Sequence, residues 1–155
     1  MTRRFFPLFA AALLAAPAAA QVADPIIGTW AITVLNATDP TKVEFRAIHT
    51  YHADGTFTEN STLAPAHREG PAQGAWRRDG DQYRLTFQLF TFDEKGEFAG
   101  FVRVRCTMRI AQAGRLEAST VVDFIEPNGT VNLAIGNGPF VGRKLSIDPS
   151  GPAAF

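Results

Sequence analysis

Apolar and polar residues alternate along this chain with a period of two, and turn-forming residues interrupt the alternation at short intervals. Successive side chains of a β-strand point to opposite faces, so the pattern predicts strands with one buried face. Helical spacing of apolar residues is hard to find after residue 25. The expected strands span residues 29–35, 43–52, 56–60, 74–78, 82–92, 98–110, 116–126, 130–135 and 140–146. The sequence therefore predicts an antiparallel meander.

A three-residue loop ending at Gly114, with this glycine in the left-handed conformation, predicts how the strands before and after it pair. It places Val104 opposite Val122 on one face and Arg103 opposite Asp123 on the other. A shift of one residue would exchange the two faces, so the apolar and charged positions agree on a single register. By the same register Arg105 falls opposite an apolar residue and has no charged partner directly across.

Further turns predict more facing pairs. The Asn-Gly at 128–129 and the Asp-Gly at 79–80 are favoured two-residue hairpin turns, because both positions need positive φ. The facing pairs are Phe124 with Leu133, Trp76 with Tyr83, Phe87 with Val104, Tyr51 with Phe57 and His49 with Glu59. The last two pairs require a three-residue turn at 53–55, and a two-residue turn there would break them.

These registers give one continuous apolar face. Its members are Trp76, Tyr83, Leu85, Phe87, Leu89, Val102, Val104, Cys106, Met108, Ile110, Leu116, Val122, Phe124, Leu133 and Ile135. With no helices to cover a second face, an open sheet would leave costly unpaired edges, so closure into a barrel is favoured. We expect an all-β, up-and-down barrel of eight or nine strands, a size that can enclose a small ligand.

The first twenty residues have the composition of an export signal. Arg3 and Arg4 supply a basic start, residues 5–16 are apolar, and residues 17–20 are small. An apolar run of roughly a dozen residues is too short to cross a bilayer, which takes about 20, so we expect cleavage and no membrane span afterwards. The paired arginines also fit twin-arginine export, and either route predicts a periplasmic or secreted protein.

Removing 20 of the 155 residues leaves 135, a single-domain length. We expect a barrel domain over residues 21–147 and a flexible tail over 148–155. Residues 63–73, rich in proline and glycine, predict a long loop that could act as a lid over one mouth of the barrel.

Composition narrows the function classes. Without the signal, 13 Lys and Arg face 15 Asp and Glu, a net charge of −2 that does not favour nucleic acid. Cys106 is the only cysteine, so no internal disulfide can form and packing must hold the fold, with Phe, of which the full sequence has 13 and the chain after the signal has 10, supplying much of it. No phosphate-binding loop, nucleophile elbow or zinc-helix motif is present, and we expect no cofactor.

The tripeptide Gly28-Thr29-Trp30, which opens the first strand, resembles the Gly-x-Trp signature of lipocalins and related calycin barrels. In that superfamily the tryptophan sits at the closed end of the barrel and an arginine from near the last strand packs across it. The resemblance implies a barrel floor made by Trp30 and Arg143, where a guanidinium over an indole combines stacking with cation–π attraction. The architecture is also similar to small cyclase barrels of the allene oxide cyclase type.

An inward-facing His49 paired with Glu59 is the candidate for proton transfer. A carboxylate orients the imidazole and raises its pKa, which suits a general base. The alternative is a satisfied polar pair near the barrel mouth. His49 and His52 do not predict a metal site, since side chains three apart on a strand point to opposite faces. Cys106 as a nucleophile would need a nearby base, and none is assured by its spacing.

Three functions remain open. The leading hypothesis is a barrel that binds a small apolar or aromatic ligand rather than an enzyme. The second is a cyclase or isomerase that uses His49 and Glu59, and the third is a structural barrel with no cavity. The sequence does not predict an oligomeric state. The expected ligand-binding residues are Phe45, His49, Tyr51, Tyr83, Phe87, Val104, Cys106, Thr120 and Val122.

Overall fold

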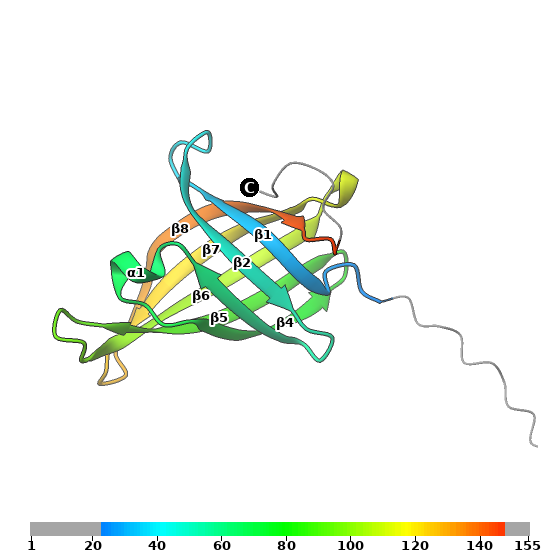
Figure 1. The fold of residues 1–155 in the computed structure, drawn as a ribbon. Coiled ribbons are helices and arrows are strands. Elements are labelled where there is room, and N and C mark those ends of the chain that lie inside the picture. Colours follow the sequence, from blue (N-terminus) through cyan, green and yellow to red (C-terminus); the bar gives the residue numbers. More distant parts are fainter. Residues whose placement is uncertain (1–22, 148–155) are drawn as a thin grey trace, which may run out of the picture.

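The computed structural model of the protein describes residues 23–147, which form one closed antiparallel barrel (Figure 1). The expected signal at 1–20 and the expected tail at 148–155 lie outside the described residues. The strands are β1 (Gly28–Leu35), β2 (Val43–Tyr51), β3 (Thr56–Ser61), β4 (Ala72–Asp79), β5 (Gln82–Phe92), β6 (Phe98–Ile110), β7 (Leu116–Ile125) and β8 (Val131–Lys144). Each strand pairs with its neighbour in sequence, and β1 pairs with β8 to close the sheet, which confirms the expected up-and-down barrel.

Two short helical turns interrupt the strands. The helix α1 (Ala64–His67) lies in the expected loop, at the same end of the barrel as the β5–β6 and β7–β8 loops (Figure 1), and η1 (Gln112–Gly114) joins β6 to β7. The chain after α1 is tied to β5, because the Gly70 amide donates to the Phe90 carbonyl at 2.9 Å. Within residues 23–147 no helix is long and apolar enough to span a membrane.

The predicted registers of β2 with β3, β5 with β6 and β6 with β7 are confirmed. His49 pairs with Glu59, Phe87 with Val104, and Arg103 with Asp123. Gly55 and Gly114 have φ of 85° and 69°, the left-handed conformation that both three-residue turns require. Loop length and side-chain pattern were sufficient to fix these three hairpins.

The β4–β5 hairpin differs from the expected one. Asp79 pairs with Gln82, so the turn lies one residue later than predicted and Trp76 faces Leu85 instead of Tyr83. The rings of Trp76 and Tyr83 still meet, with centroids 6.0 Å apart. The aromatic contact is therefore diagonal, which long side chains can reach across neighbouring strands.

The last two expected strands are one continuous strand, β8, and the pairing of Phe124 with Leu133 was wrong. Phe124 pairs with Asn132, because the turn is a three-residue loop over 127–129 in which the Glu126 amide bonds the Thr130 carbonyl. Proline suits the first position of such a turn, which moves the Asn-Gly one step along it. Leu133 is consequently 67% exposed and does not belong to the buried face, whereas Ile135, 57% exposed, still lines the cavity described below.

The residues before β1 close one end of the barrel. Ile26 is fully buried, and the Trp30 indole donates to its carbonyl at 2.8 Å. Lys144, which pairs with Trp30, donates to the Pro25 carbonyl at 3.0 Å and lies 5.8 Å from the indole centroid. The cation over the ring is thus Lys144, whereas we expected Arg143, the preceding residue of β8, which is exposed.

Candidate ligand-binding site

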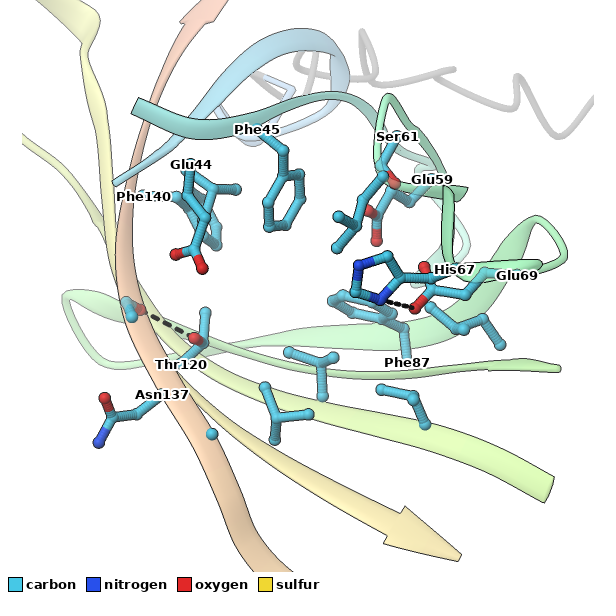
Figure 2. A pocket seen from close by; sticks show the side chains of 18 of the residues that line it. Glu44, Phe45, Glu59, Ser61, His67, Glu69, Phe87, Thr120, Asn137 and Phe140 are labelled. Carbon is cyan, nitrogen blue, oxygen red and sulfur yellow. Dashed lines mark hydrogen bonds and ion pairs between the residues drawn. The ribbon is translucent and has the colours of Figure 1, made fainter. Parts of the chain in front are cut away.

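A cavity of about 390 Å³ occupies the side of the barrel next to α1 (Figure 2). Of the residues that we expected to bind a ligand, those that line it are Phe45, His49, Phe87, Val104, Thr120 and Val122. Tyr51, Tyr83 and Cys106 are buried but are not among the lining residues. The barrel is therefore not filled by its own side chains, which disagrees with the hypothesis of a structural barrel without a cavity.

The strands supply the wall of this cavity by simple alternation. Phe87 and Leu89 on β5 and Val102 and Val104 on β6 face inward, while the residues between them face solvent. Phe140 on β8 also lines the cavity and is 3% exposed. Most of the wall is therefore aliphatic or aromatic, which favours apolar ligands.

His49 sits among aromatic rings at the cavity wall. Its imidazole meets Phe57 and Phe140 edge to face, with centroids 5.0 and 5.2 Å apart. Its Nδ1 lies 3.2 Å from the Tyr51 hydroxyl, which in turn lies 3.3 Å from the Met108 sulfur. The phenol has one proton, and the sulfur can only accept, so both contacts are hydrogen bonds when His49 donates from Nδ1. This tautomer leaves a lone pair on Nε2.

Glu59 faces His49 but does not reach it. Glu59 Oε2 lies 3.9 Å from His49 Nε2, beyond hydrogen-bond length, and among the described residues this buried oxygen has no hydrogen-bond partner. Both residues are almost fully enclosed, with 3% and 7% of their surfaces exposed. The expected juxtaposition is present, whereas the expected hydrogen bond is not.

Burial moves the two pKa values in opposite directions. It lowers the pKa of His49 to about 3, against the expectation that Glu59 would raise it. Burial also raises the pKa of Glu59 to about 7, with a smaller contribution from the negative charge of Glu69. Removal from water disfavours each charged form, and this effect outweighs the attraction across the 3.9 Å gap. His49 is therefore neutral near pH 7, and Glu59 exchanges a proton there.

Cys106 lies opposite Thr120 on the inner face of the sheet. Burial raises the pKa of its thiol, and the nearby Glu59 carboxylate adds to the increase. A thiol that stays protonated is a poor nucleophile. The proton of the Thr120 hydroxyl is already used within the barrel, since it is donated to the Gly138 carbonyl at 2.8 Å (Figure 2).

Several cavity residues escaped the sequence reasoning. Ser61 lines the cavity two positions after Glu59 on β3, and Glu44, His67 and Glu69 lie at its wall (Figure 2). The alternation that places Glu59 inward would also have identified Ser61 if the expected strand, residues 56–60, had been one residue longer. The position of Glu69 depends on the path of the loop after α1, for which the sequence contains no periodic signal.

Within residues 23–147 no group of three or more His, Cys, Asp or Glu side chains is arranged to hold a metal ion. Comparisons with protein-family models, with curated proteins and with solved structures found no match.

Proposed function

We propose that this protein is an exported, lipocalin-like barrel that binds one small, mostly apolar ligand in the cavity beside α1. The observation that supports this function is the cavity of about 390 Å³ with its largely apolar wall. This volume lies within the range of roughly 300–1,000 Å³ that is typical of small-molecule sites. The sequence of residues 1–20 supports export.

The wall accounts for affinity without strong polar contacts. Each ligand CH₂ that leaves water for an apolar site contributes about 0.8 kcal/mol. Val104, Val122 and Phe140 come from three different strands, so a ligand would be held from several sides. The barrel backbone is paired all round, which keeps the site largely preformed and limits the entropy lost on binding.

A fluorescence titration with N-phenyl-1-naphthylamine, an uncharged aromatic probe, tests this proposal. We expect saturable binding of one probe per barrel. Gly136 lines the cavity, its φ is not left-handed, and a Cβ there would meet Val122 at an ordinary 3.6 Å, so Gly136→Phe should fill the space and abolish binding. Leu133→Phe, at an exposed position of the same strand, is the matched control and should bind normally. Equal binding by both variants would place the probe elsewhere.

An isomerase or cyclase is the second candidate, and the pKa of Glu59 favours it. A buried carboxyl that titrates near pH 7 can both accept and return a proton in a cavity that largely excludes water. In the conversion of a β,γ-unsaturated cyclic ketone to its conjugated isomer, such a base removes the proton from the α carbon and returns it to the γ carbon, and absorbance reports the product directly. Conversion that disappears in Glu59→Gln would support an enzyme, whereas conversion unchanged in that variant would exclude Glu59 as the base.

A further inference from the structure

We propose that the ligand carries an amine, and that its ammonium group lies between Glu59 and His49 while its apolar body fills the cavity. This inference rests on the proposed function and names the chemical class of the ligand. It is carried by two hydrogen-bond acceptors on neighbouring strands of the cavity wall, His49 Nε2 and Glu59 Oε2, which no donor among the described residues bridges.

The first acceptor is His49 Nε2. The Tyr51 hydroxyl can donate to the Met108 sulfur only when Nδ1 of His49 donates to that hydroxyl, and we assign this tautomer, in which Nε2 keeps its lone pair. The second acceptor is Glu59 Oε2, which is buried and has no hydrogen-bond partner among the described residues. The two atoms lie 3.9 Å apart, too far to bond each other. A donor that approaches both would satisfy both.

Glu59 therefore requires a partner that the described chain does not supply. Buried polar groups in native proteins are hydrogen-bonded in the large majority of cases, so an orphaned buried oxygen at a cavity wall points to something bound there. Ser61, two residues along β3, also lines the cavity and adds a hydroxyl oxygen on the same side (Figure 2). An ammonium has three donors, as many as the acceptor groups that Glu59, His49 and Ser61 present.

The charges of the lining residues indicate which ligand head group the cavity would favour. The acidic lining residues are Glu44, Glu59 and Glu69, and no lysine or arginine is among the described lining residues. His49 is neutral, and His67 lies 3.8 Å from Glu69 (Figure 2). A carboxylate ligand would bring a second negative charge next to Glu59, whereas an ammonium would compensate it. The wall therefore favours a cationic head group over a neutral or anionic one.

Three probes with one apolar body and different head groups test the inference. They are 4-phenylbutylamine, 4-phenylbutan-1-ol and 4-phenylbutanoic acid, titrated calorimetrically into the wild-type chain. A charge-assisted hydrogen bond in a buried site corresponds to roughly a tenfold to hundredfold change in affinity. We expect the amine to bind at least about tenfold more tightly than the alcohol, and the acid to bind most weakly.

Glu59→Gln keeps the shape of the side chain and removes its charge. The amine should lose about tenfold or more in affinity in this variant, while the alcohol should change by less than about threefold. Glu94→Gln, at an exposed position on the β5–β6 loop outside the cavity, is the control and should match the wild type. Should Glu59→Gln fail to fold, the ranking of the three probes by the wild-type chain decides the question alone.

The outcomes separate this inference from the proposed function. An acid that binds as tightly as the amine, or an amine preference that survives Glu59→Gln, overturns the inference. Binding of N-phenyl-1-naphthylamine without any binding of the amine also overturns it, and means that water satisfies Glu59 while apolar binding stands. If N-phenyl-1-naphthylamine and all three head-group probes fail to bind, the proposed function fails with the inference.

Discussion

Asp123 accepts two hydrogen bonds from Arg105, at 3.0 and 2.9 Å, although the two residues do not face each other across the sheet. Arg103 donates to the same carboxylate at 3.0 Å, and so does the Ala134 amide. These groups cover Asp123 so completely that none of its surface is exposed, although it lies on the outer side of the barrel. Arg105, for which the sequence predicted no charged partner directly across, thus shares the Asp123 carboxylate with Arg103.

This cluster also explains the irregular pairing of β8. The register of β7 with β8 shifts between Val122 and Phe124, at Asp123, and Ala134 has a φ of 53°. A non-glycine residue in the left-handed region is uncommon and needs compensation. The hydrogen bond from the Ala134 amide to Asp123 supplies it, so the β-bulge and the ion cluster depend on each other.

Asp123→Asn should lower the stability of the barrel and flatten its dependence on acid. Hydrogen bonds from Arg105 and from the Ala134 amide lower the pKa of Asp123 from 3.8 to about 2. A carboxyl whose pKa is lower in the folded state stabilises the protein above its ordinary pKa, and this contribution is lost as the pH falls from about 4 to about 2. Urea denaturation at several pH values measures it. If the variant lost as much unfolding free energy as the wild type between about pH 4 and pH 2, Asp123 would not be the carboxyl responsible.

Leu116→Ala should cost about 2–5 kcal/mol of unfolding free energy, because Leu116 is fully buried against the inner face and the substitution leaves a cavity. Leu133→Ala provides the matched control on the neighbouring strand. Leu133 is 67% exposed, so its truncation should change stability by less than about 0.5 kcal/mol. Equal losses in the two variants would show that the pairing of β7 with β8 is wrong.

Glu59→Gln should make the protein more stable relative to the wild type as the pH rises. Burial raises the pKa of Glu59 from 4.5 to about 7, so the folded state holds a proton that the unfolded state releases between these values. The wild type therefore loses stability as the pH rises through this window, by up to about 3 kcal/mol, and the variant does not. Unfolding free energies at about pH 5 and pH 8 give the difference. If the difference in unfolding free energy between the two proteins were the same at both pH values, the raised pKa of Glu59 would be refuted.

His49→Phe should remove a loss of stability on the acid side. Burial lowers the pKa of His49 from 6.5 to about 3, so the unfolded chain binds a proton in this interval and the folded one does not. Stability due to neutral His49 is complete above about pH 6.5 and falls as the pH drops towards 3. The edge-to-face contacts with Phe57 and Phe140 suit a phenyl ring at this position. Thermal denaturation across this range should show a shallower acid decline for the variant.

The barrel could be predicted from the sequence where loop and pattern agree. The β6–β7 hairpin has a glycine at the left-handed position, and its apolar and charged pairs support one register, so the prediction was confirmed. The β7–β8 hairpin has an equally familiar turn signal, but Pro127 shifts the turn and the Asp123 cluster inserts a bulge. A bulge that depends on contacts among three strands leaves no local signature, and Leu133 was therefore placed on the wrong face.

The site could be predicted only in part for a similar reason. Alternation on β2 and β3 identified His49 and Glu59 as facing residues, which needed no knowledge of the rest of the fold. Their distance and protonation follow from enclosure by residues such as Phe57 on β3 and Phe140 on β8, which are far apart in the sequence. Only closure of the sheet creates that environment, and it reversed the expected direction of the His49 pKa shift.

An exposed aromatic cluster offers a rival place for an apolar ligand. Phe90, Phe98 and Phe101 stack on the outer side of β5 and β6, with ring centroids 5.0 to 6.1 Å apart, and Phe90 is 50% exposed. A probe that adheres to this cluster would bind without entering the barrel. Binding affinity alone does not distinguish the two locations, although the Gly136→Phe variant does so indirectly.

Nuclear Overhauser contacts between 4-phenylbutylamine and methyl-labelled protein locate the ligand directly. Val104 and Val122 line the cavity, whereas Ile125 pairs with Phe101 beside the outer cluster. We predict contacts from the phenyl protons to the methyl groups of Val104 and Val122. Contacts to Ile125 without any to these two valines would contradict binding inside the barrel.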